Sequence, residues 1–85
     1  MPGQPGIEKL MTDGKILADL AFVRRFGNEA AKSYAGAAIL YWMVWEDQER
    51  KSQLQYVLSN FASCRVDGAK EVKQRLREYE SSLSY

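Results

Sequence analysis

The chain has no histidine and a single cysteine, Cys64, among its 85 residues. Without histidine the commonest general base is missing, and neither a Ser-His nor a Cys-His nucleophile pair can form. Metal sites that use histidine are excluded, and so is a disulfide within the chain. The sequence also lacks a glycine-rich phosphate loop and the spacing of a calcium loop. We therefore expect a protein that is not an enzyme and that needs no cofactor.

The chain also lacks an excess of either charge, since 12 basic and 11 acidic residues give a formal net charge of +1. A dedicated non-specific nucleic-acid binder usually carries a strong basic excess, which this chain does not have. One free cysteine without a signal peptide predicts a reducing compartment, most simply the cytoplasm. A lone cysteine such as Cys64 is far more often a small core or loop residue than a nucleophile, despite the neighbouring Arg65.

Proline is confined to the first six residues, which also hold two of the six glycines. This composition predicts a disordered leader over 1–6, one helical domain over 7–82 and a frayed tail over 83–85. A domain of this size buries only roughly 60% of the surface that its unfolded chain exposes, so its stability is marginal. With disulfides and histidine-based metal sites excluded, self-association or docking on a partner is the remaining source of stability.

Apolar residues in the first third of the chain recur at spacings of three and four, which is typical of an amphipathic helix. Asp13-Gly14 interrupts the pattern. Either a short turn over 7–12 precedes the helix, or one longer helix has a weak point there. We favour Asp13 as the N-cap of a helix over 13–26, because its carboxylate can accept hydrogen bonds from the first free amides. Gly27 then ends this helix, and Asn28 can cap the next.

The longest apolar run extends from Tyr34 to Trp45 and contains both tryptophans. It is shorter than the about 20 residues that a membrane-spanning helix requires. A buried strand over 38–45 is an alternative that periodicity does not exclude. Glycine and proline are both absent between Ala37 and Asp67, however, and the run continues into charged pairs at helical spacing. We therefore expect one helix over 29–50, hydrophobic enough to form the centre of the fold.

Residues 46–53 are polar on every face and are not expected in the core. The helix either projects into solvent there or breaks, and Ser52 fits the start of a capping box. We predict a break near 50–52, a third helix over 52–62, a loop, and a fourth helix over 68–82. The predicted fold is all-α, a compact bundle of about four helices around a hydrophobic central helix.

Two kinds of residue in the central helix suggest an interface. Ala35 and Ala38 are small enough for another helix to approach closely, although ordinary core packing accounts for them as well. Tyr41 and Trp45 share one helical face, whereas Trp42 lies about 100° away, so one face belongs to the core and the other to its edge. Aromatic residues beside a polar rim are typical of interaction hot spots. The sequence predicts a non-catalytic interaction or assembly module that binds itself or a larger protein, including as its inhibitor or regulator.

The alternative is a small dimeric regulator that binds nucleic acid through the basic residues of the first and last helices, Arg24, Arg25, Lys70, Lys73 and Arg77. The last three fall on one helical stripe, which could follow a phosphate backbone. Acidic residues interleave them, so a solvated and charge-balanced face is the favoured interpretation.

Overall fold

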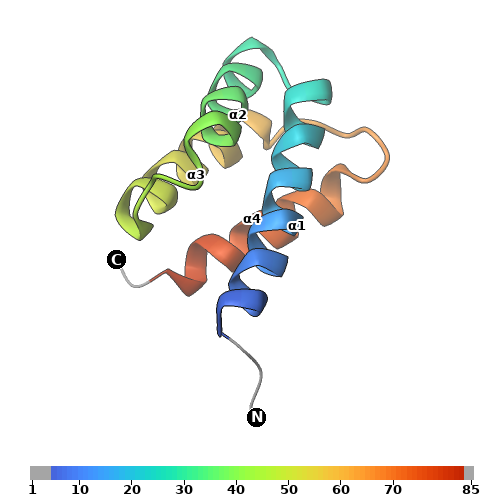
Figure 1. The fold of residues 1–85 in the computed structure, drawn as a ribbon. Coiled ribbons are helices and arrows are strands. Elements are labelled where there is room, and N and C mark those ends of the chain that lie inside the picture. The colour runs from blue at the N-terminus through green and yellow to red at the C-terminus, as the bar shows by residue number, and fades with distance from the viewer. Residues whose placement is uncertain (1–4, 84–85) are drawn as a thin grey trace.

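The computed structural model describes residues 5–83, which form four α-helices and no strand (Figure 1). The helices are α1 (Pro5–Phe26), α2 (Glu29–Tyr41), α3 (Asp47–Phe61) and α4 (Ala69–Ser82). Each helix packs against the next one in the sequence, and α4 closes the bundle against α1. The prediction of an all-α bundle of four helices is confirmed. Residues 1–4 of the predicted leader and 84–85 of the predicted tail lie outside the described residues.

Helix α1 begins at Pro5 and continues without a break to Phe26, so the predicted start at Asp13 is wrong. Proline suits the first turn of a helix because the amide that it lacks would have no partner within the helix. Asp13 lies inside α1 and is buried. Gly14 is tolerated there because a glycine costs a helix interior only about 1 kcal/mol relative to alanine.

The corner between α1 and α2 is as tight as the sequence predicts. A Cβ atom at Gly27 would lie 2.7 Å from the carbonyl oxygen of Val23 and 2.8 Å from Cβ of Ala31, so a larger residue would force the two helices apart. The Asn28 side chain accepts a hydrogen bond of 2.8 Å from the Ala31 amide and caps α2. The predicted roles of Gly27 and Asn28 are confirmed.

The break between the second and third helices is misplaced by the sequence prediction. Helix α2 ends at Tyr41, inside the apolar run, and α3 begins at Asp47 after a turn over 42–46. A single helix over 29–50 and a cap at Ser52 are therefore wrong. The turn closes when the amides of Val44 and Trp45 donate to the Tyr41 carbonyl, each at 3.0 Å. The Trp42 carbonyl accepts hydrogen bonds from the Arg50 side chain, a partner that the local sequence pattern does not reveal.

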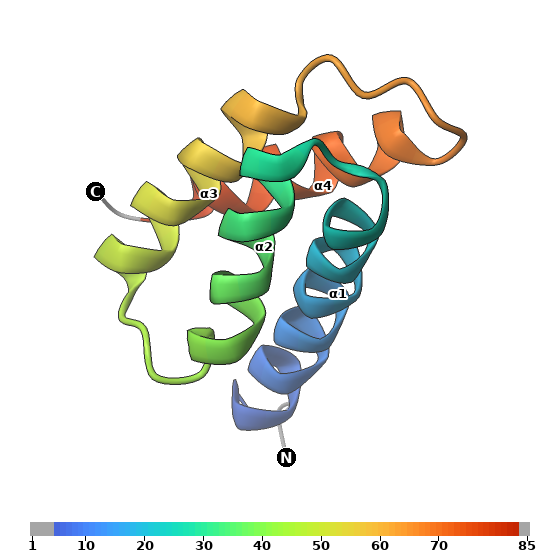
Figure 2. The same cartoon turned by 90° about the horizontal axis from the view of Figure 1, so that it is seen from above.

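Helices α3 and α4 are joined by residues 62–68, which form a loop that extends outward from the helices (Figure 2). Gly68 has a φ of +90°, a left-handed conformation that favours glycine, and it immediately precedes α4. The ammonium group of Lys73 donates to the carbonyl oxygens of Ala62 at 3.0 Å and Cys64 at 2.7 Å. Lys73 thereby satisfies carbonyls that follow the end of α3, a position where positive charge is favoured.

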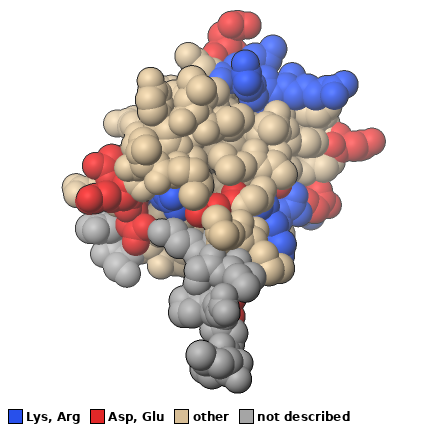
Figure 3. All heavy atoms as spheres, in the orientation of Figure 1, with Lys and Arg blue, Asp and Glu red and all other residues tan. Residues whose placement is uncertain are grey.

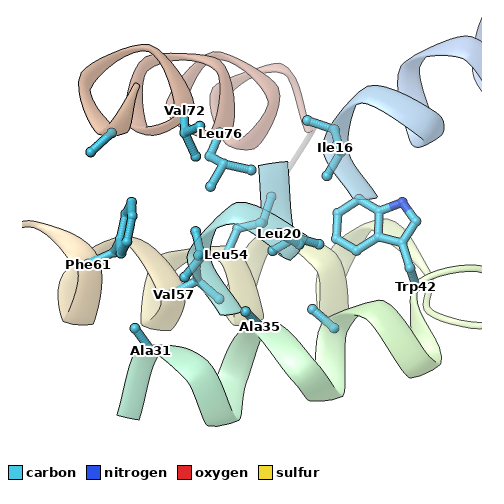
Figure 4. Packing of buried hydrophobic residues seen from close by; sticks show 13 residues of the cluster. Ile16, Leu20, Ala31, Ala35, Trp42, Leu54, Val57, Phe61, Val72 and Leu76 are labelled. Carbon is cyan, nitrogen blue, oxygen red and sulfur yellow. The ribbon is translucent and has the colours of Figure 1, made fainter. Parts of the chain in front are cut away.

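The hydrophobic core runs along the bundle between Trp42 at one end and Phe61 at the other (Figure 4). Its buried members come from all four helices and the first turn residue: Ile16, Leu20, Val23, Ala31, Ala35, Ala38, Trp42, Leu54, Val57, Phe61, Ala69, Val72 and Leu76. The three alanines form the inner face of α2, and their small side chains allow α1 and α3 to approach that helix closely. Tight intramolecular packing therefore accounts for Ala35 and Ala38.

Candidate interaction surface

A cluster of buried polar side chains lies behind the turn over 42–46 and connects it to three helices. Arg50 and Asp13 are only 3% and 2% exposed. The Nη1 group of Arg50 donates to Oδ1 of Asp13 at 3.1 Å and to the Tyr79 hydroxyl at 3.0 Å. The indole Nε1 of Trp42 donates to the same Asp13 oxygen at 3.1 Å. Residues from α1, the turn, α3 and α4 therefore meet around one ion pair.

The burial of Arg50 contradicts the expectation that residues 46–53 stay outside the core. A polar stretch can contribute a buried residue when that residue's charge is paired and its hydrogen bonds are satisfied, and Asp13 provides the opposite charge. Asp13 is separated from Arg50 by 37 positions in the chain. The ion pair between Asp13 and Arg50 therefore cannot be predicted from the local sequence of residues 46–53.

Arg50 also holds the turn in place. Its Nε and Nη2 groups donate to the carbonyl oxygen of Trp42 at 3.1 and 2.7 Å. This carbonyl follows the end of α2, where a carbonyl group has no partner within its own helix. Among the described residues, Oδ2 of Asp13 is the only buried side-chain nitrogen or oxygen without a hydrogen-bond partner. Apart from this oxygen, the buried polar groups of Asp13, Trp42 and Arg50 bond to one another or to the turn, so the cluster is suited to fixing the turn.

The anchored turn exposes four apolar side chains in and before it, which we call the apolar turn surface: Leu40, Tyr41, Met43 and Val44. Their exposed fractions are 78%, 52%, 57% and 76%, respectively. Trp42, in their midst, is completely buried. The partly buried ring of Trp45 lies against Tyr41, with 6.2 Å between the ring centroids. Of the two arrangements left open by the sequence, the structure has Trp42 in the core and Tyr41 with Trp45 at its edge.

The residues predicted for an interface are thus divided. Trp42, Ala35 and Ala38 are completely buried within their own chain, and a partner could not reach them without opening the core. Tyr41 and Trp45 remain accessible at least in part. Leu40, Met43 and Val44 were missed by the sequence prediction. The signal for Leu40 was present, because it lies opposite the helical face shared by the alanines and Trp42.

No charged residue occurs between Ser33 and Trp45. A broad face of uncharged residues over α2 is visible in Figure 3, with Lys and Arg gathered at its upper right and acidic groups above it and at its sides. The apolar turn surface therefore continues along the outer side of α2, as a stretch without charged residues of its own, as far as the exposed Ser33.

The basic residues predicted for nucleic acid lie in two places. Lys70, Lys73 and Arg77 line one hollow beside the α3–α4 connection, which Arg24 and Arg25 do not line. The Nε group of Arg24 lies beside α2, 4.0 Å from where a Cβ of Gly36 would be. The guanidinium of Arg25 lies 5.3 Å from the ring centroid of its neighbour Phe26.

A second ion pair fastens α1 to α4. The nearly buried carboxylate of Asp19 accepts hydrogen bonds from Nε of Arg75 at 2.9 Å and from its Nη2 at 2.7 Å. These hydrogen bonds raise the pKa of Arg75 above its ordinary value. Desolvation opposes part of this rise, whereas the negative charges of Asp19 and Glu71 add to it. This ion pair stabilises the contact between α1 and α4 and does not line a cavity.

Within residues 5–83, no three Cys, Asp or Glu side chains lie close enough together to hold a metal ion. No helix in that range combines the length and the hydrophobicity needed to cross a membrane. Comparison with models of known protein families, with characterised proteins and with solved structures finds no match to this chain. Inference about its function therefore rests on its own residues.

Proposed function

We propose that the protein is a non-catalytic interaction module that associates with a second copy of itself through the apolar turn surface. The observation that carries this proposal is the exposure of four apolar side chains, Leu40, Tyr41, Met43 and Val44, in and directly before a turn that Arg50 holds in place. Adjacent exposed apolar side chains are typical of interaction sites, because their contact with water is unfavourable. The single cysteine supports a cytoplasmic setting.

The fixed turn lowers the cost of association. Arg50 donates two hydrogen bonds to the Trp42 carbonyl, and the buried Trp42 ring anchors the segment in the core. The apolar side chains are therefore presented by a backbone that is already ordered before binding. Less conformational entropy is then lost on association, and more of the gain from burying apolar area is kept as affinity.

A second copy is the proposed partner because the four residues of the apolar turn surface are uncharged and would not repel the same residues of another copy. Residues from Ser33 to Trp45 are uncharged, so two copies related by a twofold axis can bring their apolar turn surfaces together without like charges from this segment facing each other. The net charge of +1 adds little long-range repulsion between copies. A larger protein with an apolar groove is the other possible occupant, and the test separates the two.

The test is sedimentation equilibrium of the wild type, of Val44→Glu and of the control Ser59→Glu. Both substitutions place one negative charge on an exposed residue, but only Val44 belongs to the apolar turn surface. We expect a concentration-dependent dimer for the wild type and for Ser59→Glu. For Val44→Glu the dimer should weaken by about 100-fold, since a carboxylate would have to lose water on association.

Circular dichroism checks that each variant keeps the helical content of the wild type. A wild type that stays monomeric at the highest concentration reached would exclude self-association and leave a larger protein as the occupant. A dimer that forms equally well in Val44→Glu would exclude the apolar turn surface as its site.

A further inference from the structure

The hollow beside the α3–α4 connection has a volume of about 350 Å³. Four of its lining residues are basic, namely Arg65, Lys70, Lys73 and Arg77, and none is acidic. It lies past the C-terminal end of α3, whereas the apolar turn surface precedes the N-terminal end of the same helix. At 1.5 Å per residue, a helix of this length separates the two places by roughly 20 Å. The hollow is therefore a feature distinct from the proposed interaction surface.

Lys73 contributes a positive charge whose position is fixed. It is only 9% exposed, and its ammonium group donates to the carbonyls of Ala62 and Cys64. Carbonyl groups satisfy hydrogen bonds but do not neutralise the charge. In the described part of the chain no carboxylate lies within 4.0 Å of this ammonium group. An ammonium group has three N–H donors, so one remains after these two hydrogen bonds.

The other three cations are exposed and can move towards a ligand. Arg65, Lys70 and Arg77 form no ion pair with any described carboxylate. Lys70 and Arg77 lie on the same face of α4 as Lys73, because positions three, four and seven apart are neighbours on a helix. Four positive charges thus border one hollow, and none of them forms an ion pair with a described carboxylate.

We propose that this hollow binds the phosphoryl group of a small phosphorylated ligand. A phosphate dianion offers several acceptor oxygens to converging donors, and a guanidinium group matches two of them at once. The volume is in the range of small-molecule sites, about 300–1,000 Å³. Val66 and Ala69 supply apolar lining for the remainder of such a ligand. A nucleic-acid backbone offers the same phosphate chemistry, and the experiment distinguishes these two sources.

The first measurement is a titration with inorganic phosphate against chloride at constant ionic strength, followed by NMR shifts of the backbone amides over 64–77. We expect a saturable shift in the wild type. Lys70→Gln and Arg77→Gln should each weaken binding by about tenfold through the loss of one charge-assisted hydrogen bond. Lys32→Gln removes one exposed positive charge outside the hollow and should leave the affinity unchanged.

An independent readout is the alkylation rate of Cys64, the only cysteine, which lines the hollow. Phosphate should slow alkylation in the wild type at concentrations that saturate the NMR shift. Shifts that never saturate, or an equal loss of affinity in Lys32→Gln, would overturn the proposal, because both indicate general charge attraction only.

The second arm uses a single-stranded thymidine oligonucleotide in place of phosphate. Binding no tighter than that of phosphate supports a small ligand. Tighter binding that requires Lys70 and Arg77 and falls steeply with salt overturns the small-ligand assignment and identifies a nucleic-acid backbone as the source. Oligonucleotide binding that both variants retain overturns the role of the hollow. The Val44→Glu variant should bind phosphate like the wild type, so failure of the dimer and failure of this site are separable.

Discussion

The guanidinium group of Arg50 lies 4.5 Å from the ring centroid of Trp42 and at the same time donates two hydrogen bonds to the Trp42 carbonyl. One side chain therefore holds both the ring and the backbone of its partner. The ring belongs to the core and the backbone to the turn that exposes the apolar turn surface. Stability of the fold and presentation of the proposed interface thus depend on the same contact.

Replacing Arg50 by methionine should lower the free energy of unfolding by about 3–5 kcal/mol, because Asp13 would be left as a buried charge without its counter-ion. The double variant Asp13→Asn with Arg50→Met should lose less than the single variant Arg50→Met. The asparagine is neutral and can still accept from the indole N–H of Trp42. Urea unfolding of the two single variants and the double variant gives the coupling energy. Simply additive losses would show that the two side chains do not act as a pair.

Replacement of Trp42 should lower the free energy of unfolding more than replacement of Trp45. Trp42→Phe removes the hydrogen bond to Asp13 and leaves a gap in the core, at a cost of about 2–4 kcal/mol in unfolding free energy. Trp45→Phe, at the core's edge, should cost no more than about 1 kcal/mol. Thermal and urea unfolding of both variants measure this difference.

Association of folded Trp42→Phe should match that of the wild type, because the ring does not reach the surface and Arg50 can still donate to the backbone carbonyl at position 42. If a fully folded Trp42→Phe protein no longer associates, the prediction is contradicted and the Trp42 ring is required for association.

The glycines offer a matched pair of substitutions with opposite signs. Gly14→Ala should raise the unfolding free energy by about 0.5–1 kcal/mol, because the added methyl group meets no atom within 4 Å beyond its chain neighbours and the adjacent backbone of its own helix, and alanine favours a helix interior. Gly27→Ala should lower it, because the methyl group would meet the Val23 carbonyl at 2.7 Å. Calorimetric melting temperatures of the two variants test the prediction, and stabilisation by both would contradict the close packing at the corner.

Arg75→Gln should cost only about 0.5–1 kcal/mol, since the Arg75 side chain is half exposed and its ion pair with Asp19 is screened by solvent. The pKa of Arg75 is raised in the folded protein by its hydrogen bonds to Asp19. A base with a raised pKa contributes its full stabilisation at every pH below its unfolded pKa, which for arginine lies far above neutral pH, and loses it only when the pH rises through the folded pKa. The stability difference between the wild type and Arg75→Gln should therefore stay constant from about pH 6 to 10. Urea unfolding at several pH values checks this, and a difference that vanishes near neutral pH would contradict it.

Much of the fold could be read from local pattern. The all-α class, the corner at Gly27 and Asn28, the end of α3 and the start of α4 after Gly68 all agree with the structure. These features depend on nearest neighbours along the chain: capping side chains, glycine conformation and the spacing of apolar residues. Lys70, Lys73 and Arg77 were also predicted to share a stripe, and the structure brings them to one hollow.

The sequence by itself determined which segments could be helices, because helix propensity, capping and amphipathic spacing act over a few residues. Only the tertiary structure decided where the apolar run breaks and which of its side chains stay exposed. Asp13 lies inside α1 because Arg50, 37 positions away, pairs with its carboxylate, and the Trp42 carbonyl can leave the helix because the same arginine satisfies it. The free energy of these contacts comes from desolvated groups far apart in the chain, and it outweighs the local preference for one continuous helix.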